Sequence, residues 1–245
     1  MVRILVTGAS TGLGLLTANT LAAQGHEVIL HARNEQRLYN RDISKAMADT
    51  IFGDLSNLDE AIGIAEQAEN YGRFDAVVHN AGVINGDDLV PVNVVAPYVL
   101  TSLMTPPSRV IVLSSSMHLS GSPRHVSAGI AGHRRVSYSD SKLFVTAWTM
   151  GMAWRWPNVL FHAVCPGWVP TRMGGASAPD DLTEGHRTQE WLATAQESTI
   201  TPRTGGYWHH MQPRAPHRAA LNEEFQEQVI RALEARTGIV LPAAP

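Results

Sequence analysis

The stretch VRILVTGASTGLGLLTANTLAAQG, residues 2–25, decides the fold of this chain. Residues 2–6 are mostly apolar and β-branched, which predicts a buried strand. Residues 15–25 place apolar side chains at helical spacing and end at a glycine, which predicts a helix. A turn with three glycines, TGASTGLG at 7–14, lies between the two. A strand, a glycine-rich turn and a helix in this order form the first unit of an α/β fold.

The same alternation continues along the chain. Further strands are predicted at 27–32, 51–53, 74–82, 109–116 and 158–167. Helical patterns are predicted at 61–72, 141–156, 180–195 and 220–236. Apolar strands that alternate with helices indicate one α/β domain over 1–245, with a doubly wound parallel sheet and helices on both faces. Residues 170–206, which are rich in Pro, Gly, Ser and Thr around one helix, are predicted to form a substrate-side flap.

Composition limits the function. The net charge is -3 and the pI is about 6.4, so no broad positive field is available and no nucleic-acid partner is expected. Cys165 has no second cysteine to pair with, and no apolar run approaches a membrane span, so we expect a cytoplasmic protein. No metal site is expected, because several histidines have no cysteine or carboxylate partner at ligand spacing: His118, His125, His133, His209 and His210.

The predicted strand exits are polar or rich in glycine, which indicates where a ligand binds. In a doubly wound sheet the carboxyl ends of the strands form that site. Gly8, Gly12 and Gly14 would let backbone amides and a helix N-terminus approach a pyrophosphate. A tight strand-to-helix turn that needs glycine for its backbone geometry is the alternative interpretation.

Arg33 follows the second predicted strand, where the ribose of a dinucleotide is read. A carboxylate there would accept bonds from a 2′-hydroxyl, whereas an arginine pairs with a 2′-phosphate. The sequence therefore favours NADP(H), with NAD(H) possible and a solvated loop arginine as the alternative. Asp54, after the third strand, could reach the adenine amino group or cap the next helix. After the fourth strand, Ala81 and Gly82 are small enough to lie under a ring, and Asn80 can tie neighbouring strands.

The segment YSDSK at 138–142 carries the chemistry. Tyr138 and Lys142 are one helical turn apart and share a face of the predicted helix. An ammonium about 5 Å from a phenol favours the phenolate, so we expect Lys142 to lower the pKa of Tyr138 and make it a general acid or base. A surface Tyr and Lys on an ordinary helix is the alternative for this motif taken alone.

Together, several motifs resemble the short-chain dehydrogenase/reductase family over nearly the whole chain. They are TGASTGLG, DL at 54–55, HNAG, Asn93, SSS at 114–116, YSDSK, and PGWVPT at 166–171. The resemblance implies a single-domain Rossmann-type fold and hydride transfer between a nicotinamide and an alcohol or carbonyl carbon. It implies a catalytic set of Asn93, Ser115, Tyr138 and Lys142, with Ser114 and Ser116 as other candidates for the active serine.

For the cofactor, the resemblance implies contacts from most of these motifs. Lys142 would bind the nicotinamide ribose, Val169 the carboxamide by its backbone, and Thr171 the pyrophosphate. The full set of expected cofactor residues is Gly8, Ser10, Thr11, Gly12, Leu13, Gly14, Arg33, Asp54, Leu55, Asn80, Ala81, Gly82, Tyr138, Lys142, Pro166, Gly167, Val169 and Thr171.

Some features depart from the family pattern. Ser115 lies 23 residues before Tyr138, a longer separation than usual, and members that resemble retinol dehydrogenases carry a similar insertion. Only ten residues separate Gly82 from Asn93, and Pro97 interrupts the helix that follows. The helix after YSDSK has more apolar residues than one buried stripe requires. This excess of apolar residues predicts that the helix forms a homodimer or homotetramer interface, or else that it is wholly buried within one chain.

The sequence thus predicts an NADP(H)-dependent oxidoreductase that acts on a small alcohol or carbonyl compound. A catalytically silent NADP(H)-sensing regulator on the same fold is the alternative from another class. Such regulators usually lack the Tyr and the Lys, and both are present here. A sugar-nucleotide epimerase or dehydratase is a second rival, but those enzymes resemble longer chains with a C-terminal substrate domain.

Overall fold

A computed structural model describes residues 1–39, 43 and 45–245, so the predicted domain 1–245 is covered except for four residues. Within this part of the chain, one sheet has the strand order β3-β2-β1-β4-β5-β6-β7-β8. All neighbouring strands are parallel except β7 and β8. The strands are β1 (Arg3–Val6), β2 (Glu27–Ala32), β3 (Asp49–Phe52), β4 (Ala76–His79), β5 (Arg109–Leu113), β6 (Leu160–Cys165), β7 (Gly206–His209) and β8 (Gln212–Arg214).

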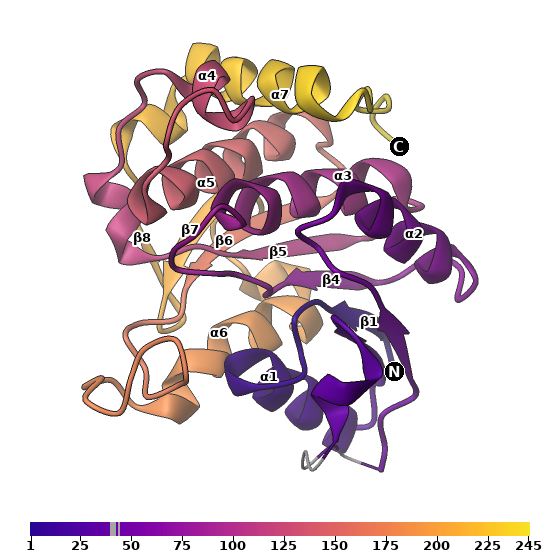
Figure 1. Cartoon of the computed structure of the whole chain (residues 1–245). Helices are drawn as coiled ribbons and strands as arrows, with labels where there is room; N and C mark the ends of the chain where they lie inside the picture. The colour runs from indigo at the N-terminus through magenta and orange to yellow at the C-terminus, as the bar shows by residue number, and fades with distance from the viewer. Residues whose placement is uncertain (40–42, 44) are drawn as a thin grey trace.

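Helices cover both faces of this sheet (Figure 1). Helices α1 (Gly12–Ala23) and α6 (Leu182–Thr194) lie on one face. Helices α2 (Leu58–Glu69), α3 (Ala96–Leu103) and α5 (Tyr138–Arg155) lie on the other. Two more helices, α4 (Val126–Ile130) and α7 (Glu223–Thr237), form a further layer outside α5. The predicted single-domain, doubly wound Rossmann-type fold is confirmed.

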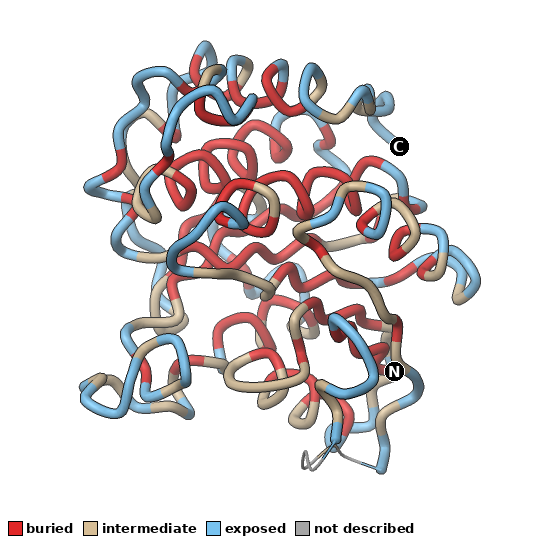
Figure 2. Tube along the Cα trace, in the orientation of Figure 1, coloured by how far each residue is buried: buried red, intermediate tan, exposed pale blue. Residues whose placement is uncertain are grey.

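The core consists of two apolar clusters, one on each side of the sheet, and Figure 2 shows buried residues along its whole length. In β1, Leu5 belongs to one cluster while Ile4 and Val6 belong to the other. Side chains of a strand alternate between the two faces, so a strand buried on both sides needs apolar residues at every position. This is why the strands read as continuous apolar runs.

The position of the site follows from the topology. The chain begins in the middle of the sheet at β1, winds outward through β2 and β3, then returns to β4 on the other side of β1. The order of the strands therefore reverses between β1 and β4. At such a reversal, the loops at the carboxyl ends of the two strands diverge and leave a crevice for a ligand.

The 170–206 segment contains more packed structure than its composition indicates. Its middle forms α6, which begins at the cap residue Asp181 and buries Leu192 and Ala193 against the sheet. The strand β7 then begins at Gly206 and adds to the edge of the sheet. Sequence patterns missed β7 and β8 because both are short: β7 has four residues, and β8 has three, all of them exposed. Movement of this segment over a substrate stays a prediction.

The apolar helix α5 is buried within the chain. Every residue from 141 to 153 is buried, and α7 and the 218–221 turn pack on this helix from outside. For example, Phe144 of α5 contacts Phe225 of α7, with ring centroids 6.2 Å apart. Of the two interpretations of this helix, packing inside one chain accounts for its composition. A homodimer or homotetramer stays a prediction without support from this helix.

The insertion between Ser115 and Tyr138 forms a short 3-10 turn at 116–120 and helix α4. Helix α4 packs against α7, where the Arg236 guanidinium donates to the carbonyl of Ile130 at the end of α4. The insertion therefore supports the C-terminal helix. No helix among the described residues is both long enough and apolar enough to cross a membrane.

Candidate functional site

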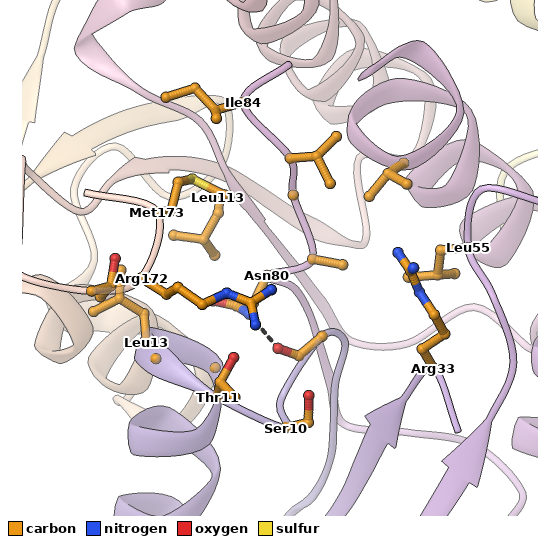
Figure 3. A pocket seen from close by; sticks show the side chains of 18 of the residues that line it. Ser10, Thr11, Leu13, Arg33, Leu55, Asn80, Ile84, Leu113, Arg172 and Met173 are labelled. Carbon is orange, nitrogen blue, oxygen red and sulfur yellow. Dashed lines mark hydrogen bonds between the residues drawn. The ribbon is translucent and has the colours of Figure 1, made fainter. Parts of the chain in front are cut away.

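A cavity of about 460 Å³ opens at the predicted crevice. Its lining comes from the exits of β1, β2, β3, β4 and β5, the start of α5, and the turn after β6 (Figure 3). All of the expected cofactor residues line it except Gly167 and Val169. Val169 is buried, and its carbonyl accepts a hydrogen bond from the Thr171 amide at 2.8 Å.

The glycine turn is held close to the exit of β4. Gly8 has φ +62°, and a Cβ there would lie 2.7 Å from the Cα of Ala81. A Cβ on Gly14 would lie 2.3 Å from the Nδ2 atom of Asn80. The Asn80 amide donates to the carbonyls of Thr7, at 3.0 Å, and Gly8, at 3.3 Å. The glycines therefore fit both interpretations of this segment. They allow the tight turn to pack against the exit of β4, and they also line the cavity without side chains.

His31 ties three strand exits together, and sequence analysis missed it. Its ring accepts from the Gly8 amide through Nδ1 at 3.0 Å, so Nε2 carries the proton and donates to the Gly53 carbonyl at 3.0 Å. Burial lowers the pKa of His31 to about 4, against weaker opposing effects of Gly53 and Asp54. The ring is therefore neutral at physiological pH and fixes the glycine turn against β3.

At the β2 end of the cavity, Arg33 extends beside Leu55 (Figure 3). Its Nε lies 3.3 Å from Oδ2 of Asp54, and both side chains are partly exposed. Burial alone would raise the pKa of Asp54, but hydrogen bonds from Ser56 and the charge of Arg33 outweigh it and lower that pKa. Asp54 does not cap α2, because Asn57 accepts from the first amides of that helix. Arg37 also lines this end.

At the other end of the cavity, α5 presents the predicted catalytic pair. Ser137 and Asp140 form a reciprocal capping box, which makes Tyr138 the first residue of the helix. Lys142 follows one turn later, with its Nζ 5.7 Å from the centroid of the Tyr138 ring. The Lys142 ammonium donates to the carbonyl of Leu113 at 2.7 Å, at the exit of β5. The two side chains therefore face the same space.

Ser115 is the serine that lies beside Tyr138. A hydrogen bond links its side chain with the Tyr138 hydroxyl, and its Oγ also accepts from the Met117 amide at 3.2 Å. Ser114 is buried, with its Oγ 2.7 Å from Oγ1 of Thr146, and Ser116 is exposed. The buried ring of His118 contacts the Ser115 carbonyl at 2.7 Å and accepts from the His217 amide at 3.0 Å. The C-terminal segment thus helps to position Ser115.

The electrostatics of this end differ from the sequence-based expectation. Burial raises the pKa of Tyr138, the hydrogen bond with Ser115 opposes the rise, and the nearby Cys165 thiol adds to it. Burial also lowers the pKa of Lys142 to about 8, although Cys165 opposes this. The predicted lowering of the Tyr138 pKa was therefore wrong for this structure, because the expectation from spacing took no account of burial.

Asn93 lies in a single π turn, Pro91–Val95, immediately before α3. Its side chain accepts from the Val83 amide and donates to the Val83 carbonyl, both at 2.9 Å, and donates to Ser141 of α5 at 3.1 Å. Pro97 does not break the helix, because it occupies the first turn of α3, where proline is tolerated. Asn93 therefore ties the exit of β4 to α5, and its role in holding a water stays a prediction.

Two further lining residues come from the loop after Thr171. Arg172 extends into the cavity on the side of Thr11 and Leu13, and Met173 lies nearby (Figure 3). Among the described contacts, the Arg172 guanidinium has no hydrogen bond or ion pair. Sequence analysis missed it because nothing in the local pattern shows that this loop folds back over the glycine turn.

The residues present fit a dinucleotide. A continuous lining leads from Arg33, past the glycine turn, to Tyr138 and Lys142. The turn contributes three glycines without side chains, and its other lining residues are Ser10, Thr11 and Leu13. Arg33 and Arg172 place positive charge at two separate points, as a molecule with a 2′-phosphate and a pyrophosphate requires. This fit depends only on the shape and charge of the lining.

Comparisons with known proteins agree with this architecture. The family model for short chain dehydrogenases matches residues 3–182. A short-chain dehydrogenase of Gibberella zeae is 34% identical over 260 residues, which cover 99% of this chain and all of the relative. Among solved structures, an uncharacterised protein of Mycobacterium paratuberculosis has a TM-score of 0.81 at 21% identity, covering 99% of this chain and 95% of that one.

A second solved structure is a short chain dehydrogenase of Shigella flexneri in complex with NADP. It has a TM-score of 0.61 at 24% identity, covering 86% of this chain and 97% of that one. At this level of identity the likeness concerns the fold. The sequence match over most of the chain carries the assignment: this protein belongs to the short-chain dehydrogenase/reductase family and is an NAD(P)-dependent oxidoreductase.

Proposed function

We propose that this protein is an NADP(H)-dependent enzyme that reduces a small carbonyl compound to an alcohol, or catalyses the reverse reaction. The observation that carries the proposal is the presence of Tyr138 and Lys142 at one end of a cavity whose other end contains Arg33, with Ser115 hydrogen-bonded to Tyr138. These groups come from two strand exits and one helix. Such a grouping has no evident use in a protein that only binds nucleotides.

The bound nicotinamide supplies or accepts the hydride. In reduction, Tyr138 donates its hydroxyl proton to the carbonyl oxygen, and its raised pKa keeps it protonated and ready to donate at neutral pH. Ser115 hydrogen-bonds the same oxygen and holds it beside the phenol. The Lys142 ammonium, close to the Tyr138 ring, stabilises the negative charge left on the phenolate. Reduction is the favoured cellular direction, because the NADPH pool is kept reduced.

Arg33 supports NADP(H) over NAD(H). It occupies the exit of β2, and its partner Asp54 belongs to the next strand exit, so no carboxylate at the β2 exit itself favours a 2′-hydroxyl. The Shigella flexneri protein with NADP bound shares the fold and supports the same choice. A cytoplasmic location remains our proposal, because the single cysteine is a buried free thiol.

A panel of aldehydes, ketones and alcohols tests the proposal, with nicotinamide absorbance measured for NADPH, NADH and their oxidised forms. We expect turnover of at least one carbonyl class with NADPH and slower turnover with NADH. NADPH binding without turnover of any compound, measured by fluorescence titration, would favour the silent regulator. Faster turnover with NADH would reject the cofactor assignment while leaving the enzyme class intact.

A further inference from the structure

A cluster of two imidazoles and a carboxylate lies behind the turn that follows β6. Side-chain ligand atoms of Asp180, His209 and His210 all lie within 4.8 Å of one another. His209 ends β7, His210 lies in the β7–β8 hairpin, and Asp180 comes from the loop before α6. The sequence places Asp180 far from the two histidines, so the expectation of no metal site rested on spacing alone.

The backbone around this cluster is adapted to bring the groups together. Gly167 has φ +86°, and a Cβ there would lie 2.5 Å from Oδ2 of Asp180 and 2.9 Å from Nε2 of His210. Any side chain at this position would therefore fill the space between the two ligand atoms. The Trp168 amide donates to Asp180 Oδ2 at 2.6 Å, and the Asp180 amide donates to the Trp168 carbonyl at 3.1 Å. These bonds fix the carboxylate against the turn.

His210 is held in an unusual conformation. It has φ 47° and Met211 has φ 60°, which are the two central positions of a two-residue hairpin turn that normally takes Asn-Gly. A non-glycine residue in the left-handed region is disfavoured by roughly 1 kcal/mol or more. The Met211 amide donates to Oγ1 of Thr188 in α6 at 2.9 Å, which anchors the turn. Residues held in such conformations often belong to functional sites.

The Nε2 atom of His210 is the least satisfied polar atom of the cluster. It is shielded from solvent and has no hydrogen-bond partner among the described residues. The two histidine rings stack with centroids 3.9 Å apart.

We propose that Asp180, His209 and His210 form a binding site for one divalent transition metal of the Zn²⁺ type. Two imidazole nitrogens and one carboxylate oxygen are a common protein donor set for Zn²⁺, with a water in the fourth position. Bonds of about 2.0–2.2 Å would bring the ligand atoms to roughly 3.3 Å from one another, so the cluster must contract slightly. The rings must also turn out of their stack, and rotation about the last histidine torsion is soft.

The bound metal would fix the turn after β6 to the hairpin at the sheet edge. Pro166, in the same turn as Gly167, lines the cavity described above. Occupancy of the site would thereby hold one wall of that cavity in place. This role is separate from the proposed oxidoreductase chemistry, so its test needs no turnover.

Direct titration tests the site. Full-length, tag-free protein treated with chelator would be titrated with Zn²⁺ by calorimetry, with Co²⁺ absorption as the spectroscopic probe. We expect one ion per chain, and at about 100 times the Kd a rise in Tm of roughly 5–10 °C. A wild-type protein that binds no stoichiometric metal would overturn the proposal.

Two conservative variants locate the binding. Asp180→Asn keeps an oxygen to accept from the Trp168 amide, and His210→Asn suits the left-handed backbone. Each should weaken Zn²⁺ binding by about 100-fold or more and abolish the Zn²⁺-dependent rise in Tm. The control variant His133→Asn, at an exposed position on the insertion, should bind as wild type does. Undiminished binding in either site variant would overturn the assignment even if the wild type binds metal.

Discussion

The two ends of the cavity are built in different ways. At the α5 end, Tyr138, Lys142 and Ser115 are held by contacts from β5, α5 and the C-terminal segment, and Lys142 is buried. At the β2 end, Arg33 and its partner Asp54 are partly exposed and belong to two short loops. The comparison teaches that the proposed proton donor lies in a buried arrangement set by many elements. The proposed determinant of cofactor choice is a small group of partly exposed charges on two loops.

The largest effect is expected from Tyr138→Phe. Removal of one hydroxyl deletes the proposed proton donor, so kcat should fall by about 10³-fold, within the range for general acid–base catalysis. The NADPH Kd, measured by fluorescence titration, should change less than about twofold, because the hydroxyl contributes little to uniform binding. The variant Tyr207→Phe removes a buried hydroxyl that contacts Cys165 and serves as the control. Retained turnover in Tyr138→Phe would reject the catalytic assignment.

The two ends of the cavity should respond differently to pH, one through kcat/KM and the other through NADPH binding. Burial lowers the pKa of Lys142 to about 8, so its ammonium is present below that pH and is lost above it. Reductive kcat/KM should therefore decline above pH 8, by up to about tenfold per pH unit. NADPH binding at the Arg33 end should stay constant from pH 7 to about 9, because arginine remains charged. A flat rate profile up to pH 10 would show that the Lys142 charge is not needed.

Arg33→Ala should weaken the binding of NADPH and leave the binding of NADH nearly unchanged. Loss of one charge-assisted contact to a 2′-phosphate is worth about 1.5–3 kcal/mol, which corresponds to roughly 10–100-fold in the NADPH Kd. NADH lacks this phosphate and should bind with nearly unchanged affinity. Titration of both cofactors gives the answer, and equal weakening of the two would mean that Arg33 does not contact the 2′-phosphate.

Arg172→Ala should give the smallest effect and sharpen the Arg33 result. An exposed guanidinium near the pyrophosphate contributes about 1 kcal/mol, so both cofactors should bind roughly fivefold more weakly. The ratio of the two Kd values should not change, because NADH and NADPH share the pyrophosphate. A change in that ratio would place Arg172 near the 2′-phosphate instead.

Sequence patterns predicted the fold well because each βα unit depends on residues that are close together along the chain. The first six strands are found where apolar runs predicted them, and the helix with Tyr138 begins at its capping box. The exits of these strands also gave most of the cavity lining. Parallel strands place their carboxyl ends at one edge of a sheet, so residue order alone brings these motifs together.

Patterns failed where distant segments meet. The strands β7 and β8 are short, and their positions depend on the pairing of β7 with β6 and of β8 with β7 rather than on composition. The apolar excess of α5 is explained only by α7, which begins 68 residues after α5 ends and covers it. The raised pKa of Tyr138 likewise depends on how deeply the finished fold buries it.

By itself, the sequence determined the order of the first six strands, the glycine turn, and the one-turn spacing of Tyr138 and Lys142, since each depends on neighbours along the chain. Only the tertiary structure decided that Ser115 meets Tyr138 across the insertion, that Arg172 reaches the glycine turn, and that Asp180 joins His209 and His210. The reason is physical: local periodicity fixes which face a residue presents. The packing of whole elements decides which residue it meets and how well water is excluded.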